Sequence, residues 1–314
     1  MKNLKFPALF TAHLIMLFTV ISVLQVQAQK VDDAYLLKSF DVSTPELDIS
    51  TSGGFINVIG HNENRVRVEM YVRKGNKYLD QSDTELDDYE IDISLSGNKV
   101  TASAKRKSGS GMRFWNNNNN LSLSFVVYTP VESVVNGRTS GGSMSAENLA
   151  GTINFATSGG SITLEKITGN MDIKTSGGSL NFKEIRGDLS GKTSGGSITV
   201  NSAEGDLNLS TSGGSIALEQ IAGSVSARTS GGSIKALTDD TGCSMDLRTS
   251  GGNVTISIPE GTGYELDLKG NRVTSTLKEF SGEVERNKLV GTIYGGGPLL
   301  AARTSGGTIR INYH

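Results

Sequence analysis

Few residues in this chain combine the type and the spacing that catalysis or cofactor binding requires. Residues 187–193 resemble a phosphate-binding loop, but three residues separate Gly187 from Gly191 where that motif needs four. Of the three histidines, only His61 lies outside both the apolar leader and the last position. The serines follow the repeat described below, so they single out no nucleophile beside a histidine and an acid. We therefore expect no catalytic residue, no cofactor and no metal site.

A row of basic residues is the strongest candidate for binding. The residue before each copy of the tetrapeptide Thr-Ser-Gly-Gly is basic in most copies, namely Arg138, Lys174, Lys192, Arg228, Arg248 and Arg303. If the copies stack, these cations form a line suited to an acidic glycan, to lipopolysaccharide phosphates or to another anionic polymer. The alternative, which the sequence favours, is a solvated charged rim that keeps the coils from associating.

A second polar row follows a repeated single glycine, and its members are Asn170, Asp188, Asp206 and Ser224. Calcium binding would need the Gly-Gly-x-Gly-x-Asp spacing of calcium-binding β-rolls, which this row lacks. We expect these residues to form solvated turns.

The elements that must position these side chains come from an internal repeat. Thr-Ser-Gly-Gly begins at positions 139, 157, 175, 193, 211 and 229, then at 249 after a longer step, with outlying copies at 51 and 304. A fixed 18-residue period is typical of a chain that stacks one small unit on itself.

Within each unit the apolar residues alternate with polar ones, as they do in β-strands. One apolar column consists of Met144, Ile162, Leu180, Ile198, Ile216 and Ile234. A helix would need apolar residues every three or four positions and would lose about 1 kcal/mol at each glycine. The pattern predicts an all-β fold, a single β-solenoid (parallel β-helix) whose strands pair in parallel about 4.8 Å apart. We expect the glycines to supply corners at positive φ and the Thr-Ser rows to bond along the stack.

The chain divides into four predicted segments. Residues 1–28 read as a secretory signal peptide, with lysines before an apolar run and small residues at its end. Residues 29–138 are expected to form an N-terminal β cap and a first coil, which residues 60–138 elaborate. Residues 139–258 form the regular solenoid, and residues 259–314 form atypical C-terminal coils and a cap, because an uncapped coil would expose a strand edge.

Composition excludes several functional classes. The 314 residues carry a formal net charge of −2, so nothing in the overall charge points to nucleic acid. Cys243 is the only cysteine, which rules out an intramolecular disulfide or a cysteine-based zinc site. Its position in the repeat predicts a small core residue.

Three segments in a fixed order carry a resemblance to a known family. The opening reads LDISTSGGFINVIG and is followed by RVRVEMYVRK, the tandem units come next, and IPEGTGYELDL and GTIYGGGPLLAARTSGGTIRI close the chain. This order resembles the DUF4097 family of bacterial proteins labelled adhesins, over essentially the whole mature chain. The resemblance implies a right-handed β-helix in an exported envelope protein, and it supplies no catalytic residues.

The sequence thus predicts a non-enzymatic exported protein that presents a rigid repetitive surface for adhesion or cell-envelope interaction. Its partner would be an envelope or surface component such as an anionic glycan, in the periplasm, on the outer surface or outside the cell. Two alternatives stay open. One is a periplasmic ligand-binding or sensory accessory protein that acts through residues 60–138. The other is a polysaccharide-active enzyme, which would need acids such as Asp83, Glu85, Asp87 and Asp88 to converge with a base.

Overall fold

The computed structural model describes residues 34–107, 121–239 and 242–314, and every regular element in these ranges is a β-strand. None of these residues belongs to a helix that could span a membrane. The predicted signal peptide at residues 1–28 and most of the loop before β8 (Leu121–Pro130) lie outside the described residues. The all-β prediction is confirmed.

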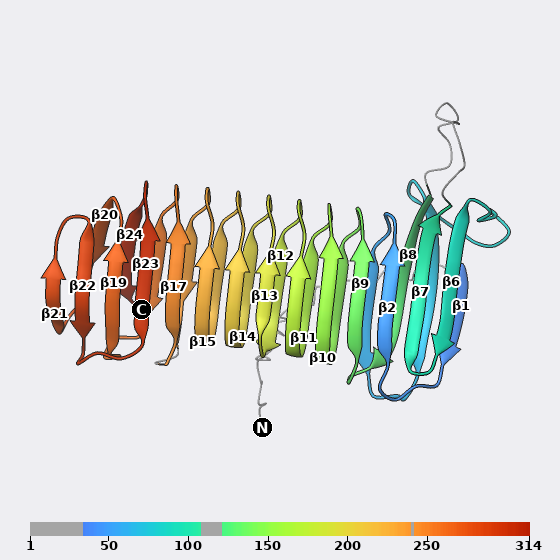
Figure 1. Ribbon diagram of the computed structural model, residues 1–314, viewed down its shortest axis with the longest axis horizontal. Helices are drawn as coiled ribbons and strands as arrows, with labels where there is room; N and C mark the ends of the chain where they lie inside the picture. Colours follow the sequence, from blue (N-terminus) through green and yellow to red (C-terminus); the bar gives the residue numbers. More distant parts are fainter. Residues whose placement is uncertain (1–33, 108–120, 240–241) are drawn as a thin grey trace, which may run out of the picture. The chain divides into compact units, whose positions relative to one another are not determined.

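Each 18-residue unit forms one coil with two strand segments. Four strands run through both segments of a coil: β10 (Met144–Thr157), β11 (Ile162–Lys174), β14 (Ile198–Ser210) and β15 (Ile216–Arg228). In one coil the segments are separate strands, β12 (Leu180–Arg186) and β13 (Leu189–Lys192). Neighbouring coils pair in parallel and in register, with each residue beside its equivalent in the next unit. The β-solenoid prediction is confirmed, and Figure 1 shows its strands side by side.

The two segments of the coils form two faces of one continuous sheet, which encloses the core. We call the face that contains the segments ending at each Thr-Ser-Gly-Gly the front face, and the face that begins after it the back face. Inward positions are buried on both faces, as at Ile153 and Phe155 in front and Met144 and Ala146 behind. Cys243 is also fully buried, as its column predicted. Because side chains alternate along a strand, the residues between these positions point outward.

The Thr-Ser-Gly-Gly turn holds neighbouring coils together. In the central copy, the Thr193 Oγ1 donates a hydrogen bond of 2.8 Å to the Gly178 carbonyl of the preceding coil and accepts one of 3.3 Å from the Gly196 N–H. A Cβ at Gly196 would lie 2.0 Å from that same carbonyl oxygen, whereas one at Gly195 would meet only ordinary contacts at 3.5 Å or more. The second glycine is therefore required by close approach of the coils.

Positive φ is found elsewhere in the coil. The prediction that glycines supply such corners holds for the single turn glycine, as at Gly205 (φ 135°), but it is wrong for the Gly-Gly pair. A second left-handed residue precedes each turn glycine by three positions, and it is not a glycine: Asn148, Lys166, Glu184, Ser202 and Gln220.

At the N-terminal end, the first coil along the sequence is the second coil of the stack. It consists of β2 (Glu46–Thr51) and β3 (Ile56–His61), which pair on one side with β9 (Val134–Thr139) and β10. On the other side β7 (Lys99–Arg106) pairs in parallel with β2, and β8 pairs in parallel with β3. Residues 60–138 thus contribute a further coil, in addition to the elaboration that the sequence suggested.

Antiparallel strands close this end. On the front face β6 (Tyr89–Ser96) pairs with β7, and on the back face β4 (Val66–Lys74) pairs with β8. The back face continues from β4 to β1 (Leu36–Phe40), and the short β5 (Lys77–Leu79) forms a hairpin with β4. Three edge strands with different directions and lengths replace the uniform edge that a cut solenoid would expose.

The C-terminal end repeats this plan. Its last strands are β23 (Leu299–Thr304), which pairs with β17 (Ser244–Thr249), and β24 (Thr308–Tyr313), which pairs with β18 (Val254–Ile258). On its other side β18 pairs with β16 (Ile234–Leu237). Outside them lie β19 (Tyr264–Lys269) and β20 (Arg272–Ser275), then the antiparallel β22 (Lys288–Ile293) and β21 (Phe280–Val284). Figure 1 shows β23 between β17 and β19.

The outlying Thr-Ser-Gly-Gly copies therefore join the tandem ones in space. Thr139 Oγ1 bonds to the Gly54 carbonyl at 2.9 Å, and Thr304 Oγ1 bonds to the Gly252 carbonyl at 2.8 Å. All the copies that the sequence contains form one uninterrupted row of turns.

Candidate functional site

The residues that resembled catalytic or phosphate-binding groups have structural roles. Residues 189–192 form the extended β13, and Gly191 faces the ring of Phe182 across the core. His61 Nδ1 accepts a 3.0 Å hydrogen bond from the Glu63 N–H. The segment thus has the geometry of a strand in the stack, and His61 stabilises the turn after β3.

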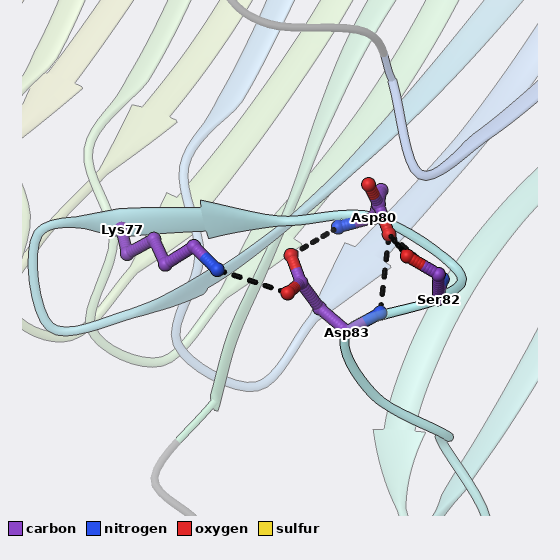
Figure 2. A network of polar contacts seen from close by, with 4 residues as sticks. All are labelled: Lys77, Asp80, Ser82 and Asp83. Carbon is purple, nitrogen blue, oxygen red and sulfur yellow. Dashed lines mark hydrogen bonds and ion pairs between the residues drawn. The ribbon is translucent and has the colours of Figure 1, made fainter.

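The acids of the loop between β5 and β6 do not converge with a base in a pocket. Figure 2 shows Asp80 accepting hydrogen bonds from Ser82 and from the Asp83 N–H, while Asp83 accepts one from the Asp80 N–H. Lys77 Nζ lies 2.9 Å from Asp83 Oδ1. The Ser82 hydroxyl, followed by its backbone N–H, lowers the pKa of the Asp80 carboxyl. These contacts stabilise the loop itself, while the side chains of Glu85, Asp87 and Asp88 form no ion pair with any described residue.

The polar row after the turn glycines is solvated. Asn170, Asp188, Asp206 and Ser224 are all exposed. Among the residues that the structure describes, no three His, Cys, Asp or Glu side chains are grouped closely enough to hold a metal ion.

The predicted basic residues occupy one line across the front face. We call Arg138, Lys174, Lys192, Arg228, Arg248 and Arg303 the basic ladder. The strand register places Ser50, Arg138, Ala156, Lys174, Lys192, Ser210, Arg228, Arg248, Arg303 and Lys269 on successive strands. The basic ladder is exposed along its length. Ala156 and Ser210 interrupt it, and Lys269 extends it by one strand.

A parallel row of carboxylates neutralises part of the basic ladder. Asp246 lies 2.8 Å from Arg248 and 3.2 Å from Arg228. Lys174 is 2.6 Å from Asp172, its neighbour two residues earlier. The hydrogen bond that Arg248 donates to Asp246, and then the negative charge of Asp246, raise the pKa of Arg248. The front face is therefore a line of cations with acids beside it, and its positive potential is lower than the basic residues alone would give.

The most enclosed of these acids is Asp267 in β19. Its two carboxylate oxygens lie 2.9 Å from Lys269 Nζ and 2.7 Å from Arg303 Nη2. The hydrogen bond from Lys269, aided by Arg303, holds the pKa of Asp267 below its usual value, although partial burial opposes the shift. This group links β19 to β23, two strands that the sequence separates by about thirty residues.

Two members of the basic ladder lack such a partner. Arg138 and Lys192 have no carboxylate within ion-pairing distance among the described residues. Their neighbours two residues earlier are Asn136 and Ser190, which carry no charge. Arg138 and Lys192 are the cations best placed to meet an external anion.

Sequence reasoning missed the acids that accompany the basic ladder. The signal was present, because Asp172, Asp246 and Asp267 each precede a basic residue by two positions. Residues two apart on a strand share a face and lie close enough for an ion pair. Lys269 was missed because no Thr-Ser-Gly-Gly follows it.

The sequence model of the family described as Toastrack DUF4097 matches residues 44–312. No curated protein matches the chain.

Three solved structures with low sequence identity are similar to this chain. One, described as a "putative lipid binding protein" from Parabacteroides distasonis, is 15% identical with a TM-score of 0.47, and the match covers 89% of this chain and 98% of that one. A "putative adhesin" from Parabacteroides merdae is 14% identical with a TM-score of 0.43, covering 88% and 95%. Another from Bacteroides fragilis is 11% identical with a TM-score of 0.40, covering 88% and 96%.

Proposed function

The chain belongs to the Toastrack DUF4097 family, and from this premise we propose that it is a non-enzymatic exported protein that presents a rigid repetitive surface for adhesion or cell-envelope contact. The observation that carries the proposal is the single row of turns, from Thr51 to Thr304, that joins each coil containing the tetrapeptide to the preceding coil of the stack. Such a stack repeats equivalent outward positions at the strand spacing of about 4.8 Å.

Binding would be multivalent. One exposed cation gives a weak contact with an anionic polymer in water and salt. Several cations on one rigid face act together, because the first contact raises the effective concentration of the next. The acids beside the basic ladder moderate this attraction and favour a partner with spaced charges over a densely charged one.

The proposal is tested by changing Lys174, Lys192, Arg228 and Arg248 to Gln and measuring binding to heparin, a soluble anionic polymer. We expect an affinity about tenfold lower, which corresponds to about 1.4 kcal/mol. The matched control changes Lys183, Arg186, Lys235 and Arg310 to Gln, which removes the same charge from the back face and its corner. Equal losses in both variants would show that net charge matters and the front face does not.

The alternative of a ligand-binding protein that acts through residues 60–138 needs a test other than deletion. Removing that segment would also remove β7 and β8, which cover the inner side chains of β2 and β3 at one end of the core. A deletion would therefore disturb the stack as well as any ligand site. Point substitutions in the groove described next separate the two effects.

A further inference from the structure

A groove of about 610 Å³ lies on the front face at its N-terminal end, where β6, β7, β2 and β9 are adjacent. The register places one line of outward side chains across these four strands: Arg138, Ser50, Ser103 and Asp92. At the usual strand spacing this line is about 14 Å long. A second cation and acid, Lys105 and Glu90, lie opposite each other on β7 and β6 and also line the groove.

These polar groups have little to bind within the protein. Arg138 and Lys105 meet no carboxylate within ion-pairing distance among the described residues, and Glu90 and Asp92 meet no cation there. The hydroxyls of Ser50 and Ser103 form no hydrogen bond with a described residue. This differs from the rest of the basic ladder, where most of the cations form ion pairs with Asp172, Asp246 or Asp267. The groove is thus the place on the basic ladder where donors and acceptors of both signs are unused.

The chemistry of the lining selects among ligand classes. A densely charged polyanion would be repelled by Glu90 and Asp92, which line the groove beside Asp48, an acid that already lies 3.1 Å from Lys99. A peptide strand adds to an open sheet edge, such as the outer edge of β6, whereas the groove lies on the face of four strands that are paired with one another. Sugar hydroxyls both donate and accept, so they suit carboxylates, serine hydroxyls and cations in one site. A carboxylate on the sugar would pair with the free guanidinium of Arg138.

We propose that this groove binds a short acidic oligosaccharide, with a sugar carboxylate at Arg138 and Lys105 and neighbouring sugar hydroxyls donating to Asp92 and Glu90. The proposal rests on the proposed function and names the ligand class that the surface contacts at this end. The volume is within the range of small-molecule sites, and the 14 Å line is long enough for more than one sugar ring.

The test measures binding of uronic-acid oligosaccharides, galacturonate trimer and hyaluronan tetrasaccharide, by calorimetry, with chitotetraose as the neutral comparison. We expect at least one acidic probe to bind and chitotetraose to bind at least tenfold more weakly. Arg138→Gln should weaken the acidic probe about tenfold. Lys192→Gln is the matched control, because Lys192 is the other unpaired cation of the basic ladder but lies outside the groove, and it should leave binding unchanged.

For a second pair of variants, simple charge attraction and the proposed hydrogen bonds predict opposite changes in affinity for an acidic probe. Glu90→Gln and Asp92→Asn make the groove more positive, so attraction alone predicts tighter binding of an acidic probe. Loss of two hydroxyl acceptors predicts weaker binding, by about fivefold or more, and this is the expected result. The side chains changed in these tests are all exposed, namely Glu90, Asp92, Arg138 and Lys192. Unchanged melting temperatures would verify that the variants are folded.

The outcomes separate this inference from the proposed function. If heparin binding depends on the basic ladder but neither acidic probe binds, the proposed function stands and the groove assignment is overturned. Equal effects of Arg138→Gln and Lys192→Gln, or tighter binding by Glu90→Gln and Asp92→Asn, would also overturn it. Loss of the acidic probe in Arg138→Gln and in the Glu90→Gln and Asp92→Asn variants, with heparin binding retained by the last two, which lie outside the basic ladder, supports it.

Discussion

At the scale of single residues, the threonine and the second glycine of Thr-Ser-Gly-Gly are each required for a different physical reason. The threonine is buried yet satisfies its hydroxyl twice, once within its own coil and once with the preceding coil. A buried hydroxyl without partners would cost about 1–3 kcal/mol, so the pairing is needed at every copy. The second glycine leaves room for the carbonyl that accepts the threonine bond.

The two glycines should therefore respond differently to the same substitution. Gly196→Ala would place a Cβ 2.0 Å from the Gly178 carbonyl oxygen, which is backbone and cannot move aside without shifting the coil. We expect a loss of about 2 kcal/mol or more in the free energy of unfolding, measured in urea. Gly195→Ala, one residue away, should change it by about 0.5 kcal/mol or less. Similar losses at both positions would contradict the close-approach explanation.

The carboxylate of Asp267 should make stability depend on pH. Lys269 and Arg303 lower its folded pKa below the unfolded value, so ionised Asp267 stabilises the fold above the unfolded pKa of about 4. This contribution disappears as the pH falls through the folded pKa. Asp267→Asn should lower the free energy of unfolding by up to about 1 kcal/mol at pH 7, and the difference from the unmodified protein should shrink below about pH 4. A constant difference between pH 7 and pH 3 would contradict this assignment.

At the scale of elements, the coil was predictable because its core columns repeat the same residue types at the same positions. The alternation of apolar and polar residues settles which side chains face inward, and the spacing settles which coils are neighbours. The left-handed corner was not predictable. Its five residues are all polar, but only Asn148 is of a type that favours the left-handed conformation. Stacking imposes this conformation on them, at a cost of about 1–2 kcal/mol each.

The inward columns can be tested with two adjacent residues of β14. Ile198 is fully buried, so Ile198→Asp would place an unpaired charge in the core and should cost at least about 3 kcal/mol. Thr199 points outward and is exposed, so Thr199→Asp should leave the melting temperature within a few degrees of the unmodified protein. An unchanged melting temperature for Ile198→Asp would refute the assignment of that column to the interior.

At the scale of the whole described structure, both ends use the same arrangement. The chain places an outer coil and antiparallel strands beyond the coil that contains its outlying Thr-Ser-Gly-Gly copy. The sequence indicated that residues 51–54 and 304–307 resemble the repeat, but it could not show that they are stacked with it. The intervening segments break the period, so spacing carried no information about which strands they join. The basic ladder was predictable only as far as the period continued.

The arrangement predicts where the stack can be lengthened. A second copy of residues 175–192 inserted after residue 192 meets the same neighbours as the original, because each coil contacts only the coils beside it. We expect a folded protein that is longer by about 4.8 Å, measured by small-angle X-ray scattering.

The control appends the same 18 residues after His314. There β23 and β24 already have strands on both sides, so the added unit finds no edge to join. We expect limited proteolysis to remove the appended copy and to leave the inserted one intact. Protection of the appended unit would show that the end is open.

The position of the final strand also decides how this molecule could be immobilised or joined to another protein. His314 follows β24, whose coil lies one before the outermost coil, and it bonds back to Asp239 and Ile258. A surface linker or fusion partner attached there would leave from the flank of the stack. The tip formed by β21 and β22 would remain uncovered, and the groove at the opposite tip would lie many coils away from the attachment point.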